Sequence, residues 1–260
     1  MPSATGLIFL RAGTAILAAT LGGLLAIRGR DVSHRTLCAL VSFAAGALLS
    51  VTILNIAPEA AKLADWRAAI VSIAIGALVF YLIGRYVSYV CPACAASAID
   101  ERSGYLRLGT LLVIALGLHS TMDGLAIAVG AEEGIKAVGV LILLAVSYHK
   151  LPEGIALASV ARLAGFSRPR ALLITVLIEL TTGLGAFIGL VAVSGVSSFW
   201  LGVIMAHAGG SFIYIVGFAV ITELREHEPA PIILNLAAGF LVMAALSLIL
   251  PRFGPFAHGH

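Results

Sequence analysis

The chain has 260 residues, of which 60% are hydrophobic and 11% are charged, and its formal net charge is +3. Soluble domains usually carry about a quarter of charged residues, so this composition, with a mean hydropathy of +1.08, excludes a soluble globular domain and predicts a polytopic membrane protein. The sequence has no basic patch of the kind that binds nucleic acid, so we expect the lipid bilayer, and no nucleic acid, as a partner.

Long apolar runs predict an all-α fold. A helix needs roughly 17 to 25 apolar residues to cross the hydrocarbon core of a bilayer. Runs of this length predict eight transmembrane helices, near 6–27, 36–58, 68–90, 108–131, 135–161, 170–194, 198–222 and 230–250. We expect residues 1–260 to form a single transmembrane domain.

The longest linker, at about 91–107, contains Cys91 and Cys94. A CxxC pair has the spacing of half a zinc site, but no second pair follows nearby, which favours an ordinary loop.

Basic residues are unequally divided between the two sides of the predicted bundle. The side with the odd-numbered linkers holds ten, which are Arg28, Arg30, Arg35, Arg85, Arg102, Arg107, Arg162, Arg168, Arg170 and Arg225. The side with both termini holds five, which are Arg11, Lys62, Arg67, Lys136 and Arg252. The positive-inside rule therefore predicts a cytoplasmic 91–107 loop and extracytoplasmic termini. We expect the protein to reside in the plasma membrane or inner membrane.

Seven ionisable residues lie near the middle of the predicted spans, where charge is rare. They are His119, Asp123, His149, Lys150, Glu153, Glu179 and His207. A central Asp or Lys costs of order 2.5–3.5 kcal/mol on insertion scales, so such groups usually face the interior and have a function there. By contrast, Glu59 and Glu223 stand near helix ends, and we expect them to be interfacial.

Four of these residues come from two similar stretches, HSTMDGLAIA at 119–128 and HKLPEGIALA at 149–158. Residues four apart share one face of a helix, so His119 and Asp123 point the same way, as do His149 and Glu153. Two adjacent antiparallel helices could bring both pairs together. Imidazoles and carboxylates suit Zn²⁺, and also Fe²⁺ or Mn²⁺, while the lack of thiolate argues against Cu(I).

The charges of this group leave room for one divalent cation. Asp123, Glu153 and Glu179 contribute −3 and Lys150 contributes +1, so the remaining −2 would be balanced by one such ion. Other interpretations stay open: Lys150 could be a structural counter-ion to Glu153, and His207, which has no acidic neighbour at i+4, could be an interhelical hydrogen-bonding residue.

A weaker similarity links AAGALLSVTILNIAPE in the second run to HAGGSFIYIVGFAVITE in the seventh. Since these helices would point in opposite directions, the similarity fits an inverted repeat of helices one to three and six to eight around a central pair, a 3+2+3 arrangement.

The paired motifs His119–Gly124 and His149–Gly154 resemble the fourth- and fifth-helix motifs of the ZIP (Zrt- and Irt-like protein) family, as does Glu179 in the sixth helix. The resemblance implies uptake of a divalent metal ion, Zn²⁺ first and Fe²⁺, Mn²⁺ or Cd²⁺ as alternatives, toward the cytoplasm by alternating access. It implies a transporter rather than an enzyme, with no cofactor apart from the transported ion. It also implies a homodimer and movement of helices one, four, five and six against the rest.

By position, the resemblance makes His119, Asp123, His149 and Glu153 the main ligands, with Glu179 bordering a second site. Members with two adjacent metals carry Asn or Asp after each motif histidine, whereas this chain has Ser120 and Lys150. We hypothesise that the Lys150 ammonium replaces a second cation. Helix two also lacks a thioether or carboxylate ligand, offering Leu48 and its neighbours instead.

Two other functions compete with transport. Two histidines and a carboxylate with one open position also form a catalytic set, so an intramembrane zinc-dependent hydrolase is the alternative, although the chain has no HExxH sequence. A scaffold whose polar core only fixes helix pairing is a third interpretation.

Overall fold

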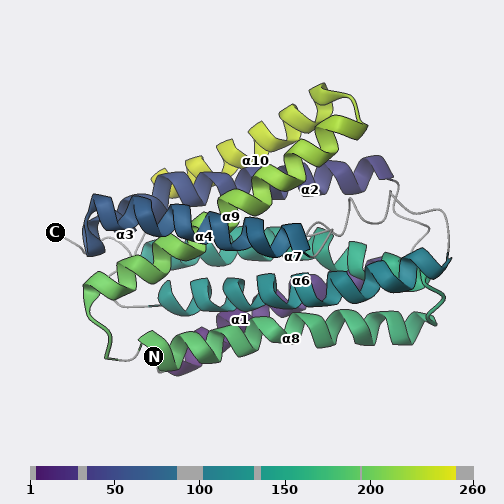
Figure 1. Ribbon diagram of the computed structural model, residues 1–260, viewed down its shortest axis with the longest axis horizontal. Helices are drawn as coiled ribbons and strands as arrows, with labels where there is room; N and C mark the ends of the chain where they lie inside the picture. Colours follow the sequence, from purple (N-terminus) through teal and green to yellow (C-terminus); the bar gives the residue numbers. More distant parts are fainter. Residues whose placement is uncertain (1–3, 29–33, 87–101, 132–135, 194, 250–260) are drawn as a thin grey trace.

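The structure is a computed structural model that describes residues 4–28, 34–86, 102–131, 136–193 and 195–249. Its elements are α1 (Ala4–Arg28), α2 (His34–Val51), the π-helical turn η1 (Thr52–Ile56), α3 (Ala57–Ala64), α4 (Trp66–Tyr86), α6 (Arg102–Val129), α7 (Lys136–Leu163), α8 (Arg168–Val193), α9 (Ser198–Glu226) and α10 (Pro229–Ile249). Because α2, η1 and α3 continue one another, the described residues form eight long helical rods (Figure 1), each over one predicted span. Cys91, Cys94 and most of the predicted 91–107 loop lie outside the described residues.

Seven of these rods are long and apolar enough to cross a membrane by length and composition. The remaining rod, α6, has 28 residues and packs along α8 within the same bundle, so we treat it as the eighth span. The protein is therefore an all-helical, polytopic membrane protein.

Successive rods run in opposite directions, so α1 begins at the end of the bundle where α10 finishes (Figure 1). We call this end the terminal end, and the end where α1 finishes and α2 begins the hairpin end. The side of the membrane that each end faces stays a prediction.

The second rod is longer than predicted. Residues 57–64 were expected to lie partly in a linker, but they form α3 and the helix passes straight through Pro58. A proline lacks the backbone N–H that a continuing helix uses. Here the preceding turn is widened, with the Ala57 N–H bonded to the carbonyl of Thr52, five residues back. The rod finally turns at Asp65, whose φ is 99° and whose Oδ1 accepts hydrogen bonds from two backbone N–H groups at the start of α4.

Reciprocal glycines allow four pairs of helices to approach closely. The closest partners are α1 with α7, α6 with α8, α2 with α10, and α4 with α9. A Cβ added at a glycine on either member would overlap the partner's main chain. The four glycine pairs are Gly22 with Gly154, Gly124 with Gly185, Gly46 with Gly239, and Gly76 with Gly210. Because lipid tails are as apolar as leucine, such small residues give membrane helices the close contact that holds them together.

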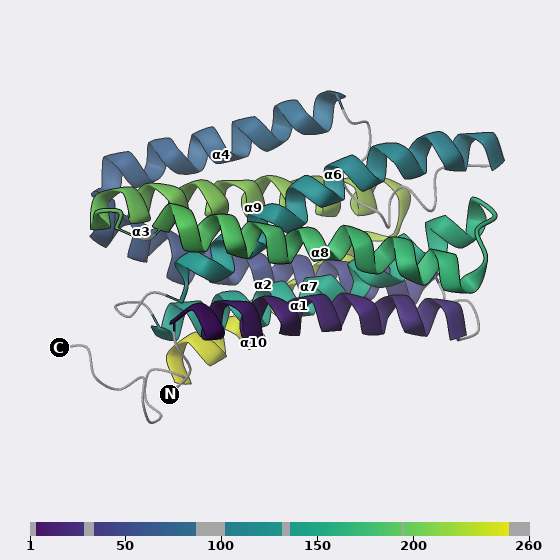
Figure 2. The same cartoon turned by 90° about the horizontal axis from the view of Figure 1, so that it is seen from below.

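The rods form two layers. One contains α1, α6, α7 and α8, and the other contains α2, α3, α4, α9 and α10 (Figure 1). Figure 2 shows α1 and α8 side by side at the outside of the first layer. In the most apolar stretch of α7, 67% of the residues are buried, whereas in that of α10 only 17% are. The helix α7 is therefore central, and α10 lies at the outside with exposed leucines. The ionisable residues in the middle of α6 and α7 are buried in the protein interior; they are His119, Asp123, His149, Lys150 and Glu153.

Candidate metal site

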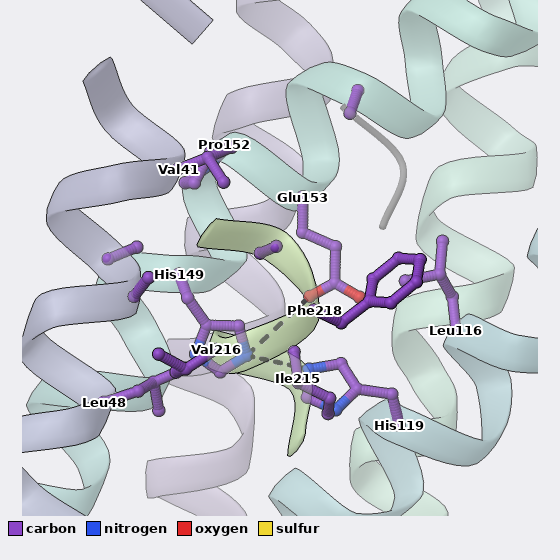
Figure 3. A pocket seen from close by; sticks show the side chains of 14 residues that line it. Val41, Leu48, Leu116, His119, His149, Pro152, Glu153, Ile215, Val216 and Phe218 are labelled. Carbon is purple, nitrogen blue, oxygen red and sulfur yellow. Dashed lines mark hydrogen bonds and ion pairs between the residues drawn. The ribbon is translucent and has the colours of Figure 1, made fainter. Parts of the chain in front are cut away.

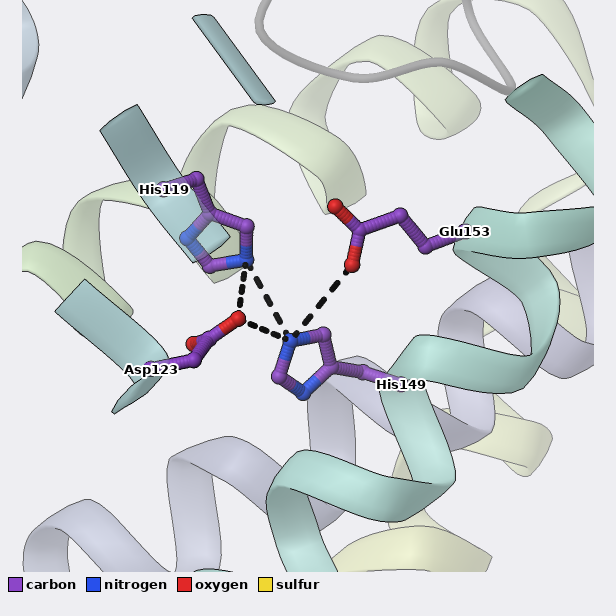
Figure 4. A group of neighbouring side chains, drawn as sticks. All are labelled: His119, Asp123, His149 and Glu153. Atoms are coloured by element: carbon purple, nitrogen blue, oxygen red, sulfur yellow. Dashed lines mark hydrogen bonds and ion pairs between the residues drawn. The ribbon is translucent and has the colours of Figure 1, made fainter. Parts of the chain in front are cut away.

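Two central helices bring the paired motif residues to one point. His119 and Asp123 project from α6, and His149 and Glu153 from α7 (Figure 4). Their exposed fractions are 4%, 0%, 8% and 7%. One ligand atom from each lies within 4.8 Å of the others. Each motif ends in a glycine that lets its helix pack closely against another helix. Gly124 brings α6 against α8, and Gly154 brings α7 against α1.

The spacing of the four donor atoms fits a small tetrahedral ion. The Nε2 atoms of His119 and His149 are 3.3 Å apart, and Asp123 Oδ2 lies 3.6 Å and 3.2 Å from them. Glu153 Oε2 is 3.9 Å from the His149 Nε2. Zinc bonds to N and O ligands of about 2.0–2.1 Å, arranged tetrahedrally, place neighbouring ligand atoms about 3.3–3.4 Å apart. Only small movements are therefore needed to seat an ion among them.

The second nitrogen of His149 orients its ring for metal binding. Its Nδ1 lies 3.2 Å from the Ala145 carbonyl oxygen, one turn earlier on α7. Because a carbonyl only accepts, we assign the proton to Nδ1, which leaves the Nε2 lone pair facing the cluster. Ligating histidines usually have such a second hydrogen bond. The residue types alone did not reveal Ala145, although the i−4 carbonyl is the obvious acceptor on a helix.

A buried lysine lies against the carboxylates of the cluster. The Nζ of Lys150 donates to Ser120 Oγ at 2.6 Å and forms ion pairs with Asp123 at 3.0 Å, Glu153 at 2.9 Å and Glu179 at 2.9 Å. The exposed fraction of Lys150 is 0%. Glu179 reaches this point from α8, the close partner of α6. One ammonium thus contacts all three carboxylates, two of which also belong to the metal cluster.

A cavity of about 80 Å³ adjoins the site between the two layers (Figure 3). Besides the two histidines and Glu153, its walls are almost entirely apolar, with Leu48 on α2 and Val216 and Phe218 on α9. Along α7 its lining runs from His149 to Ala156, so the cavity extends from the site toward the hairpin end.

Toward the terminal end, the interior is tightly packed. Leu141, Ile142, Ala145 and Val146 of α7 and Ile127 of α6 are at most 1% exposed and belong to one apolar core cluster. The site therefore adjoins a cavity on the side of the hairpin end and packed apolar side chains on the side of the terminal end.

His207 does not join the site. It lies on α9, where its backbone carbonyl packs against Gly76 of α4, and it is neither in the donor cluster nor on the cavity wall. The structure thus separates it from His119 and His149, and a role for its side chain stays a prediction.

Comparison with known families and proteins adds a separate line of evidence. Residues 95–247, more than half of the chain and including both motifs, match the family described as ZIP Zinc transporter. No curated protein matches the chain. Together with the buried His/Asp/Glu cluster in a polytopic helical bundle, this match shows that the chain belongs to the ZIP zinc transporter family, which implies transport of a divalent metal ion rather than enzymatic catalysis.

Proposed function

We propose that this protein carries Zn²⁺ across the membrane toward the cytoplasm, with His119, Asp123, His149 and Glu153 as its ligands. The observation that carries the proposal is the convergence of four buried donor atoms, all within 4.8 Å of one another, with four of their six separations at 3.2–3.9 Å. Two nitrogen and two oxygen donors suit Zn²⁺ and also accommodate Fe²⁺, Mn²⁺ or Cd²⁺. Family membership does not favour the intramembrane hydrolase.

The asymmetry around the site supports alternating access. The cavity extends only toward the hairpin end, which the distribution of basic residues predicts to be cytoplasmic, while apolar packing closes the terminal end. The described conformation is thus one that would release an ion inward. Entry from outside needs the layer of α1, α6, α7 and α8 to move against the other layer, carrying the site with it.

The helix pairings support a 3+2+3 inverted repeat. In such a repeat, α1 corresponds to α8, α2 to α9, α4 to α10, and α6 to α7. Under this correspondence the close α1–α7 pair matches the close α8–α6 pair. The α2–α10 pair likewise matches the α9–α4 pair. Each of these pairs has its own reciprocal glycines. Such symmetry lets one scaffold adopt two equivalent conformations that face opposite sides.

We further propose that one ion occupies the site at a time. The Lys150 ammonium, within 3.0 Å of three carboxylates, stands where a second cation would otherwise share Asp123 and Glu153. It neutralises one of three negative charges, and the remaining −2 matches a single divalent ion. Assembly as a homodimer and residence in the plasma or inner membrane stay predictions.

The test is uptake of radioactive Zn²⁺ into proteoliposomes that contain the purified protein. We expect His149→Ala and Glu153→Ala each to abolish uptake, because each removes one of four ligands. His207→Ala is the matched control, since it removes a histidine from a spanning helix outside the cluster, and it should retain uptake. Absence of uptake by the folded wild-type protein, or full uptake by His149→Ala, would reject the proposal. Competition with unlabelled Fe²⁺, Mn²⁺ and Cd²⁺ measures the selectivity.

A further inference from the structure

A second group of metal-ligating side chains lies near the hairpin end, away from the site described above. It consists of Cys38 on α2, Glu223 on α9 and His227, which caps the carboxyl end of α9. One donor atom of each lies within 4.8 Å of the other two. Glu223 is only 3% exposed, although its position near a helix end indicated an interfacial residue. Packing of α2 against α9 buries it.

Local geometry explains how the three donors converge. Glu223 and His227 are four residues apart, and the His227 N–H closes the last turn of α9 on the Glu223 carbonyl at 3.0 Å. Their side chains meet as well, with 3.2 Å between His227 Nδ1 and Glu223 Oε2. The thiol of Cys38 arrives from the first turns of α2, which packs along α9.

We propose that Cys38, Glu223 and His227 form a second binding site for a divalent metal ion of the Zn²⁺, Co²⁺ or Cd²⁺ class. A thiolate, a carboxylate and a neutral imidazole are a ligand set that these metals favour, and their −2 charge balances one such ion. Three protein ligands leave a fourth, open position for water.

A cavity of about 530 Å³ beside the cluster provides access to that open position, with Cys38 and His227 on its wall. The same wall carries one positive and one negative side chain, Arg35 and Glu228, so their formal charges offset each other. The thiolate distinguishes this cluster from the site formed by His119, Asp123, His149 and Glu153, which has only nitrogen and oxygen donors.

The cluster lies on the route an ion would take out of the transport cavity. Val41 and Ala219 line that cavity, and Cys38 and Glu223 lie about one turn further toward the hairpin end on the same two helices. An ion released from His149 toward the hairpin end would therefore next meet the thiolate cluster. This receiving role rests on the proposed transport function, whereas metal binding by the cluster does not.

The binding test uses the full-length protein with Cys91→Ser and Cys94→Ser. Because the chain has three cysteines, Cys38 is then the only thiol. Titration with Co²⁺ should produce the near-ultraviolet charge-transfer absorption of a cobalt thiolate, a signal that reports only the ion bound at Cys38. Cys38→Ser should abolish the band, and Glu223→Gln and His227→Ala should each weaken Co²⁺ affinity by on the order of 100-fold, since even indirect ligand contacts are worth 10–100-fold. Glu228→Gln, on the same cavity wall, is the matched control and should leave the affinity unchanged.

Two results would overturn the assignment: no charge-transfer band in the protein whose only thiol is Cys38, or an affinity that neither Glu223→Gln nor His227→Ala alters. His149→Ala separates the two proposals, because it should stop Zn²⁺ uptake and keep the cobalt thiolate band. In proteoliposomes, Cys38→Ser should slow uptake of Zn²⁺. An unchanged uptake rate would rule out the receiving role.

Discussion

Replacing Lys150 by leucine should reveal how strongly the carboxylates depend on its ammonium. The wild-type Nζ is fully buried and lies within 3.0 Å of oxygens from Asp123, Glu153 and Glu179. Leucine removes the positive charge and all hydrogen-bonding capacity at this point. Three carboxylates then remain buried with no cation beside them, which is the unfavourable case for buried charges.

The expected loss is large. Removing one partner of a buried ion pair typically costs about 3–5 kcal/mol, because the other charge is left uncompensated. At roughly 2–4 °C per kcal/mol for chains of 150–250 residues, the metal-free Lys150→Leu protein should have a Tm lowered by on the order of 10 °C. Zn²⁺ should partly reverse this loss, since a ligand at 100 times its Kd stabilises by about 2.7 kcal/mol.

Lys62→Leu is the matched control. Lys62 also forms a 2.9 Å ion pair, with Glu59, but its side chain is 72% exposed, and exposed pairs contribute little. Both variants would be heated in detergent with chelator and then with Zn²⁺, and the folded fraction measured by size-exclusion chromatography. If the metal-free Tm of Lys150→Leu equalled that of Lys62→Leu, the ammonium would not be the counter-charge of the site, and the one-ion proposal would lose its basis.

Three further predictions concern stoichiometry, packing and selectivity. In a Cys38→Ser background, which lacks the proposed thiolate site, Lys150→Asp should raise bound Zn²⁺, measured by elemental analysis of the purified protein, from one ion toward two, because a carboxylate replaces the ammonium; a ratio that stays at one argues against a displaced second cation. Gly154→Ala should lower stability by about 1–3 kcal/mol, as overpacking does, because its Cβ overlaps the Ala19 carbonyl, whereas Gly13→Ala, with no atom within 4 Å, should have little effect; equal Tm values would contradict the close α1–α7 contact. Leu48→Met places a soft thioether on the cavity wall and should shift uptake competition toward Cd²⁺, and unchanged competition would show that α2 does not reach the ion.

Most of the helices could be predicted from local composition. Apolar runs long enough to span a bilayer occur at eight places, and each corresponds to a helical rod in the described residues. The boundary between the second and third rods was predicted less well. Proline and charged residues at 58–62 resemble a linker, but the π-helical turn at Thr52–Ile56 lets the helix continue to Ala64. This turn also packs against α9, and that contact between distant parts of the chain is not visible in the local sequence.

The candidate site was only partly predictable. The spacing of four residues predicted that each motif histidine shares a helix face with its carboxylate. The rarity of charged residues in membrane spans singled out these residues as a candidate site. The position of Lys150 among three carboxylates, one of them from α8, could not be obtained from spacing, because it depends on how α6, α7 and α8 pack. The Cys38 cluster was missed for the same reason, since Cys38 is separated from Glu223 and His227 by most of the chain.

By itself, the sequence determined that this is a helical membrane protein with paired His/carboxylate motifs of the ZIP type, because hydrophobic length and helical periodicity are local properties. Only the tertiary structure decided which helices touch, through the reciprocal glycines that permit main-chain contact. It also decided that the cavity beside His149 extends toward the hairpin end alone. Such features arise from contacts between residues distant in the chain, where interior packing selects one arrangement among those that the helices allow.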